Sequence, residues 1–291
     1  MRSVSEYEPC EREQLLSLQD AIDTGKLNLV FQPKFDLCSG TLQGAEALIR
    51  WYPETPVACW QCPDKFVCLA EENGLSGALD LHILESVLRI TRNWSASTRM
   101  TLGPVSVNIS ASSIQMPDFE RTVKEVIAPT AYPGLIFELT ETAPITEPFM
   151  ARQTLQNLTD YGIKLSLDDF LTGYNQISYL RLLPVSEIKI DRGDVAELAT
   201  QKGKKKVKYM LALARAAGLK VTAEGIETTS QYETLRELGC HFGQGYWFSP
   251  ALPSDALERF VERYTPETFR TESGDSHFPA GPGANRELAE I

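Results

Sequence analysis

Short apolar runs alternate with segments of helical periodicity along most of the chain. Eight of the runs have the length and composition of β-strands, and they cover residues 27–35, 41–51, 104–110, 135–141, 163–169, 187–191, 219–225 and 242–248. Apolar residues at helical spacing predict helices at residues 11–25, 63–73, 78–95, 117–128, 148–161, 194–217, 229–238 and 253–263. Because strands and helices alternate, we predict a largely parallel sheet with the helices outside it.

The number of strands favours a closed barrel of the α/β class, the (β/α)8 or TIM barrel, which commonly uses about 250 residues. The first two strands depart from the alternation, because only the short loop LCSG at residues 37–40 joins them. So short a link makes a hairpin, and the first strand should therefore run antiparallel to the second. We predict a modified TIM barrel at residues 26–264, a helical segment at residues 1–25 that packs on the barrel, and a disordered tail at residues 265–291.

Charged and amide side chains collect at the ends of the predicted strands. The stretch LSLDDF at residues 165–170 ends in Asp168 and Asp169, whose carboxylates repel each other unless a cation lies nearby. Polar residues on the other strands and at their ends are Glu46, Asn108, Glu138, Glu141, Lys189, Asp191, Glu224, Glu227 and Gln244. In a TIM barrel the carboxyl ends of the strands converge on the face that holds the active site. We therefore predict one acidic cluster there, neutralised by metal ions.

The residue types in this cluster indicate which metals it would bind. Carboxylates and the Asn108 amide are oxygen ligands that suit Mg²⁺ or Mn²⁺, and the sequence has no histidine set for zinc or iron. Asp168 and Asp169 can serve two ions only where the strand ends and turns, because successive strand residues point to opposite sides. Two ions about 4 Å apart are a known device for in-line phosphoryl displacement. Lys189 would orient the attacking water or offset excess negative charge.

Each residue also has a simpler interpretation when it is taken alone. Asp168 and Asp169 have the residue type of helix caps, and Lys189 alone would be a surface lysine. Gln32 and Gln244 are equally consistent with local hydrogen bonding. The recurrence of polar residues at seven strand ends favours a site over these separate interpretations.

An ordered set of motifs between residues 12 and 263 resembles the EAL family of cyclic di-GMP phosphodiesterases. The motifs are EALIRW (46–51), NIS (108–110), FELTET (137–142), LSLDDF (165–170), IKIDR (188–192), VTAEGIET (221–228) and GQGYWFSP (243–250). No single motif is specific. Their order, with each at the end of a predicted strand, makes a chance match an unsatisfactory explanation.

The resemblance implies two metal ions, Mg²⁺ or Mn²⁺, in each active site. It implies that one ion is bound by Glu46, Asn108, Glu138 and Asp168. Asp168 and Asp169 would hold the second ion, and Asp191 would support the cluster. The catalytic set that it implies is Glu46, Asp169, Lys189 and Glu224, and the choice between Lys189 and Glu224 as the residue that deprotonates the water stays open.

The resemblance also implies how the substrate is held and what happens to it. Arg50 would meet a phosphate, and Gln32, Gln244 and Glu227 would lie along the dinucleotide or beside the metal ligands. Glu141 would anchor the loop after the fifth strand. The implied reaction opens cyclic di-GMP at one phosphodiester to give linear pGpG in bacterial second-messenger signalling such as biofilm control, and the implied assembly is a homodimer.

One departure from the family pattern follows the paired aspartates. The family typically has DFGTGYSSL, whereas this chain has DFLTGYNQI with Leu171 in place of glycine. If that position needs a positive φ, leucine costs on the order of 1 kcal/mol or forces another loop path. Two functions therefore stay open: an active phosphodiesterase, and a cyclic di-GMP receptor that signals through protein partners. An enzyme for a different phosphodiester is a third alternative.

Composition and cysteine spacing exclude other classes. A net charge of −11 argues against a general nucleic-acid surface, so we expect no DNA binding. Neither a secretory leader nor a membrane span is visible, so we expect a cytoplasmic protein. Cys59 and Cys62, with Cys68 nearby, allow a zinc or redox site, but reduced thiols fit better because no fourth ligand is visible. The basic run at residues 202–208 is typical of a solvated helix start, with a docking or nucleotide role as the alternative.

Overall fold

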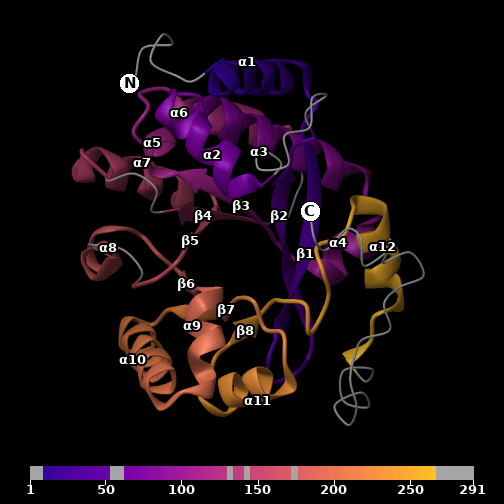
Figure 1. Ribbon diagram of the computed structural model, residues 1–291, viewed down its shortest axis with the longest axis vertical. Coiled ribbons are helices and arrows are strands. Elements are labelled where there is room, and N and C mark those ends of the chain that lie inside the picture. The colour runs from indigo at the N-terminus through magenta and orange to yellow at the C-terminus, as the bar shows by residue number, and fades with distance from the viewer. Residues whose placement is uncertain (1–8, 53–61, 130–133, 141–144, 172–175, 267–291) are drawn as a thin grey trace.

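The computed structural model describes residues 9–52, 62–129, 134–140, 145–171 and 176–266 of the chain. Its strands close into one barrel in the order in which they occur in the sequence (Figure 1). They are β1 (Asn28–Asp36), β2 (Leu42–Arg50), β3 (Val105–Ser110), β4 (Leu135–Thr140), β5 (Lys164–Leu167), β6 (Glu187–Ile190), β7 (Lys220–Ala223) and β8 (Phe242–Gly243).

The direction of the strands confirms the predicted modified TIM barrel. Every neighbouring pair from β2 to β8 is parallel, whereas β1 is antiparallel to β2 and to β8. The hairpin follows from Asp36, whose Oδ1 atom accepts hydrogen bonds from the backbone N–H groups of Cys38 at 2.9 Å and Ser39 at 2.8 Å. Gly40, at φ 75°, completes the turn in a conformation that favours glycine.

Helices surround the ring of strands (Figure 1). They are α1 (Pro9–Thr24), α2 (Pro63–Glu72), α3 (Ser76–Asn93), α4 (Ala96–Leu102), α5 (Ala111–Ile114), α6 (Phe119–Ile127), α7 (Pro148–Asp160), α8 (Gln176–Leu182), α9 (Arg192–Ala196), α10 (Gln201–Ala217), α11 (Thr229–Glu237) and α12 (Ser254–Arg263), and a 3-10 turn, η3, covers Glu197–Ala199. Side-chain caps define several starts. Thr228 and Gln231, for example, form a reciprocal capping box at α11.

The helix prediction is wrong in two respects. The helices α4, α5 and α8 lie where the apolar pattern predicts none, because elements of 7, 4 and 7 residues are too short to show a helical period. The predicted single helix at 194–217 is interrupted between α9 and α10. Thr200 caps the start of α10, and Gly203 lies so close to the backbone of Glu197 that a Cβ atom there would overlap it.

Six strands end earlier than their apolar runs, namely β2, β4, β5, β6, β7 and β8. The strand β5 stops at Leu167, so Asp168 and Asp169 lie just beyond it, and β6 stops before Asp191. The strand β8 covers only Phe242 and Gly243, because Gly245 has φ 150° and turns the chain against the backbone of Ile226. The N–H group of Ile226 donates to the carbonyl oxygen of Gln244 at 3.1 Å, and that of Trp247 donates to the carbonyl oxygen of Ile226 at 2.8 Å.

The apolar core lies between the barrel wall and the helices. Phe35 on β1 stacks on Phe248 with ring centroids 4.8 Å apart, and Phe31 meets Trp94 edge to face. Leu18 and Ile22 on α1 are buried in the same core. The division of the chain at residues 25 and 264 stays a prediction, and the tail beyond Thr265 and Pro266 lies outside the described residues.

Asp80 on α3 fixes the end of β3. Its Oδ2 atom accepts hydrogen bonds from Ser110 N at 2.8 Å, Ser110 Oγ at 3.0 Å and Ser113 Oγ at 2.6 Å. Burial raises the pKa of Asp80 to about 6, although the serine hydrogen bonds act in the opposite direction. The carboxylate therefore ties a helix to the strand that carries Asn108, at a cost that depends on its ionisation.

Replacing Gly245 with alanine should destabilise the fold more than the same change at Gly162. Both residues have positive φ, at 150° and 105°, but a Cβ atom would overlap the backbone of Ile226 at Gly245 and meets open space at Gly162. We expect about 1 kcal/mol lost for Gly162→Ala and clearly more for Gly245→Ala. Urea unfolding of both variants measures this, and equal losses would contradict the account.

The ionisation of Asp80 should lower stability as pH rises. Its folded pKa of about 6 exceeds the unfolded value, so the folded state binds the extra proton and loses that advantage between about pH 4 and 6. The difference amounts to about 3 kcal/mol at most. Asp80→Asn removes this titration. Between about pH 4 and 6, the free energy of unfolding of this variant should therefore rise relative to that of the wild type, as measured by urea unfolding at each pH. Parallel pH profiles for the two proteins would refute the assignment.

Candidate active site

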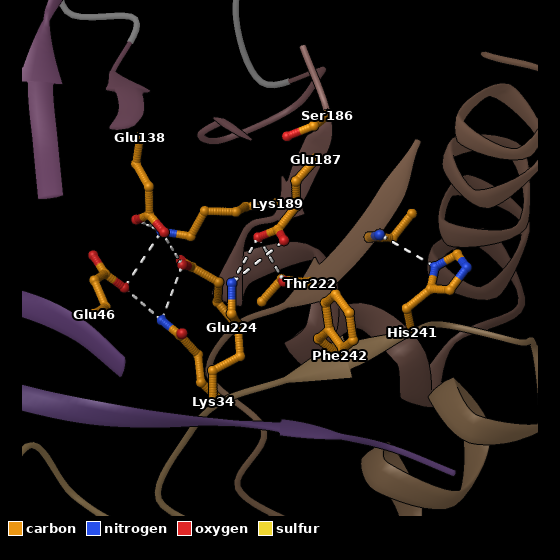
Figure 2. Close-up of polar contacts among 12 residues, drawn as sticks. Lys34, Glu46, Glu138, Ser186, Glu187, Lys189, Thr222, Glu224, His241 and Phe242 are labelled. Atoms are coloured by element: carbon orange, nitrogen blue, oxygen red, sulfur yellow. Dashed lines mark hydrogen bonds and ion pairs between the residues drawn. The ribbon is translucent and has the colours of Figure 1, made fainter. Parts of the chain in front are cut away.

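One buried ammonium group organises the carboxyl ends of the strands. Lys189 on β6 is 1% exposed. Its Nζ atom lies 2.5 Å from Glu224 Oε1, 2.6 Å from Glu138 Oε2 and 3.3 Å from Glu46 Oε2 (Figure 2). It also lies 3.2 Å from Asp168 Oδ1. Four carboxylates from four different strands or strand ends therefore share this cation.

Strand alternation explains why these side chains meet. Asn108 on β3 pairs in register with Glu138 on β4, and residues that share a face of neighbouring strands point into the barrel together. The Nδ2 atom of Asn108 donates to Glu46 Oε1 at 2.9 Å. Just beyond β8, Gln244 Nε2 donates to Glu46 Oε2 at 2.5 Å and to Glu224 Oε1 at 3.2 Å. The sequence-predicted Glu46, Asn108, Glu138, Lys189, Glu224 and Gln244 are thus brought together with Asp168.

The charges in this cluster are not balanced by its own lysine. Burial raises the pKa of Glu46, but the Lys189 charge and the hydrogen bonds from Gln244 and Asn108 together bring it below the usual value. Burial, followed by repulsion from Glu46, raises the pKa of Glu138 to about 8. Burial also raises the pKa of Glu224. Without a further cation, full ionisation of these carboxylates is therefore unfavourable.

The donor set fits a hard divalent cation. Ligand oxygens of Asp168, Asp169 and Glu224 lie within 4.8 Å of one another. The Oδ1 atom of Asn108 is buried and has no hydrogen-bond partner within the part of the chain that the structure describes, so it is available as a further ligand. All of these donors are oxygens, as Mg²⁺ and Mn²⁺ prefer.

The turn after β5 sets the position of the paired aspartates. Asp169 has φ 47° and Leu171 has φ 66°, both in the left-handed region. Burial, then the charges of Asp168 and Asp191, raise the pKa of Asp169 to about 6. The predicted strand turn at this point is therefore present, and Leu171 does occupy the conformation that favours glycine.

Other predicted site residues make local contacts instead. Gln32 Nε2 donates to the carbonyl oxygen of Ser249 at 3.3 Å, and Arg50 Nη1 donates to the carbonyl oxygen of Ile49 at 2.8 Å. Asp191 accepts from the N–H group of Gly193 at 2.8 Å and thereby caps α9. Glu227 is exposed. Glu141 lies outside the described residues, so its predicted role as a loop anchor stays a prediction.

Two features singled out in the sequence, the cysteines and the basic run, lie outside the cluster. Cys62 and Cys68 are exposed free thiols, and Cys59 lies outside the described residues. The basic run forms the start of α10, where Lys206 pairs with Asp194 at 2.5 Å.

Within the described ranges, no helix combines the length and the apolar character that a membrane crossing requires.

Sequence reasoning missed a second polar group inside the barrel, formed by Lys34, Glu187 and Thr222. The group comes from strands β1, β6 and β7, in that order. Along the chain, its members lie two positions from Gln32, Lys189 and Glu224, respectively. The two-residue period of a strand was the available signal, because it places both members of each such pair on one face.

Comparisons with known proteins match most of the chain, barrel included. The EAL domain model matches residues 16–251. The cyclic di-GMP phosphodiesterase NbdA of Pseudomonas aeruginosa is 35% identical over 250 residues, covering 85% of this chain and 32% of NbdA. This chain spans about a third of the length of the curated relatives first matched.

Solved structures extend this similarity to three dimensions. The PaMucR phosphodiesterase in complex with c-di-GMP matches with a TM-score of 0.75 and 34% identity, covering 84% of this chain and 99% of the other. The EAL enzyme Bd1971, with cAMP and cyclic di-GMP bound, matches with a TM-score of 0.79 and 27% identity, covering 87% of this chain and 69% of the other. The fold and site define a TIM-barrel protein with an acidic centre. This chain belongs to the EAL domain family.

Removing the central cation should make the fold dependent on added metal. Lys189→Met leaves four carboxylates without their shared ammonium, so we expect a loss of about 3 to 5 kcal/mol in metal-free buffer. Added Mn²⁺ should recover part of it and raise the melting temperature more than in the wild type. Lys124→Met on α6, which breaks a half-exposed pair with Glu120, is the matched control. A variant that is as stable as this control and does not respond to Mn²⁺ would contradict the site.

Proposed function

We propose that this chain is a cyclic di-GMP-specific phosphodiesterase that hydrolyses one phosphodiester to give linear pGpG. The observation that carries the proposal is the buried set of oxygen donors around Lys189, with the buried Oδ1 atom of Asn108 among them. The similarity to the cyclic di-GMP phosphodiesterase NbdA and to the PaMucR phosphodiesterase in its c-di-GMP complex supports the choice of substrate. We further propose that the chain acts as a homodimer in the cytoplasm in second-messenger signalling.

Two metal ions, Mg²⁺ or Mn²⁺, fit the proposal. Glu46, Asn108, Glu138 and Asp168 would hold one ion, and Asp168 with Asp169 would hold the other. Bound there, the ions would supply an activated water and charge neutralisation at the phosphate. The donor set supports this assignment through its all-oxygen chemistry and the close approach of Asp168, Asp169 and Glu224.

The remaining residues divide the work by their position. Lys189 is almost fully buried, so its ammonium would hold the ligand carboxylates in place. The Glu224 side chain is 19% exposed at the rim, so it would meet the attacking water and take its proton. Gln244 bridges Glu46 and Glu224 and would keep them at a fixed separation. Arg50 and Gln32 would contact the dinucleotide after their present local contacts are exchanged, and the exposed Glu227 would contact it directly.

Purified protein should convert cyclic di-GMP to pGpG with Mg²⁺ or Mn²⁺, and Glu46→Ala should abolish this. Because loss of outer-shell partners alone costs about 10–100-fold, a ligand should cost at least that much. Arg259→Met, which breaks an exposed pair with Asp255 on α12, is the control and should retain full activity. Chromatography of the products measures the reaction, with a second cyclic dinucleotide as a specificity arm. Equal turnover of that second dinucleotide would favour the different-phosphodiester alternative.

A cyclic di-GMP receptor is the second candidate, and the conformation of Leu171 favours it. A leucine at φ 66° next to the paired aspartates costs on the order of 1 kcal/mol and affects the path of the site turn. Tight binding of cyclic di-GMP without product would support this candidate over the enzyme.

Reverting this residue distinguishes a slow enzyme from a receptor. Leu171→Gly should raise turnover severalfold while binding of cyclic di-GMP changes little, since glycine adopts the positive φ without cost. Single-turnover kinetics and calorimetric binding measure the two quantities. An unchanged rate would show that the leucine does not limit the reaction.

A further inference from the structure

We infer that Lys34, Glu187 and Thr222 form a positioning unit that places Lys189 and Glu224 for the reaction. The inference rests on the proposed function and assigns a role in it to residues outside the metal-ligand set. Lys34 Nζ lies 3.0 Å from Glu187 Oε1 and 3.3 Å from Oε2, and Thr222 Oγ1 donates to Glu187 Oε1 at 2.9 Å (Figure 2).

The unit crosses the inside of the barrel. The strands β1 and β6 are not neighbours in the closed sheet, so a direct contact between Lys34 and Glu187 passes through the interior. Both side chains are buried, at 3% and 7% exposure, and Thr222 is fully buried. Lys34 also lies over the ring of Phe242 on β8, at 5.7 Å from its centroid. The contacts therefore join four strands of the barrel wall.

Two members of the unit, Glu187 and Thr222, lie close along the chain to members of the site. Glu187 precedes Lys189 by two residues, and Thr222 precedes Glu224 by two residues. Two strand residues span only about 6.6 Å, so the unit lies directly beneath the carboxylate cluster. Thr222 is also the register partner of Lys189 across β6 and β7. Displacing β6 against β7 would therefore move the ammonium of Lys189 relative to the carboxylate of Glu224.

Charge pairing gives the unit a second effect on Lys189. Glu187 brings a fifth carboxylate to the interior on the same strand as Lys189, and Lys34 pairs with it. Because Lys34 neutralises this charge, the ammonium of Lys189 stays with the four carboxylates at the strand ends.

Stability alone does not account for an ion pair in this place. The inner layers of such barrels are dominated by branched apolar residues. Replacing a buried ion pair with apolar residues of similar volume is often neutral or stabilising. If the unit serves placement, an apolar replacement should lower activity without lowering stability. If it serves stability, the same replacement should lower stability.

The decisive variant is Lys34→Met/Glu187→Met/Thr222→Val, which replaces the whole unit with apolar groups of similar shape. We expect a melting temperature equal to or above that of the wild type. We also expect a fall in kcat of about tenfold or more with KM little changed, because small displacements of reacting groups cost that much. Calorimetric titration with Mn²⁺, without substrate, should show a dissociation constant raised about fivefold or more. The control, Lys124→Met/Glu120→Met on the outer helix α6, should leave kcat and Mn²⁺ binding unchanged.

Two results would overturn the inference. The first is a folded triple variant with kcat and Mn²⁺ affinity within about twofold of the wild type, and the second is a loss of activity that follows a loss of melting temperature. If the triple variant does not fold, the isosteric Thr222→Val removes one hydrogen bond only. It should lower kcat and Mn²⁺ affinity at an unchanged melting temperature, and wild-type values would overturn the inference. A wild type that binds Mn²⁺ without hydrolysing cyclic di-GMP would refute the proposed function instead. The inference would still be tested in that case, because the Mn²⁺ dissociation constants of the wild type and the variants can be compared without any turnover.

Discussion

Lys189 places one buried positive charge among the carboxylates of Glu46, Glu138, Asp168 and Glu224. Each of these acids comes from a different strand or strand end, so the contact depends on closure of the whole barrel. Neither the buried lysine nor the buried acids would be stable alone, because each loses hydration that the opposite charge must replace. The arrangement therefore couples folding of the sheet to assembly of a site that is still short of positive charge.

The barrel interior is polar at two levels. At the strand ends, Lys189 and Gln244 hold the carboxylates, and the buried Oδ1 atom of Asn108 completes a donor set suited to a hard cation. Below them, the ion pair of Lys34 and Glu187 occupies space that apolar side chains usually fill in this fold. The chain thus places charge where packing alone would favour hydrocarbon, which is a familiar trade between stability and function.

The architecture and the centre of the site are readable from the sequence for a physical reason. Parallel strands bring their carboxyl ends together, so Glu46, Glu138 and Lys189 converge once the βα alternation is recognised. Short elements escape this reading, and so does the early end of β8, where Gly245 turns against Ile226. Asp191 illustrates a competing local interaction, because its carboxylate caps α9 while its charge still acts on Asp169. Lys34 and Glu187 meet across the barrel, and a pattern read along one strand contains no record of such a contact.

The proposed reaction requires this acidic centre to direct water to a phosphodiester of cyclic di-GMP. Incubation with Mn²⁺ in ¹⁸O-labelled water, followed by mass spectrometry of the dinucleotide, tests it most directly. We expect linear pGpG that carries one ¹⁸O atom in its terminal phosphate. Cyclic di-GMP that stays intact while bound to the protein, or a linear product without the label, would contradict it.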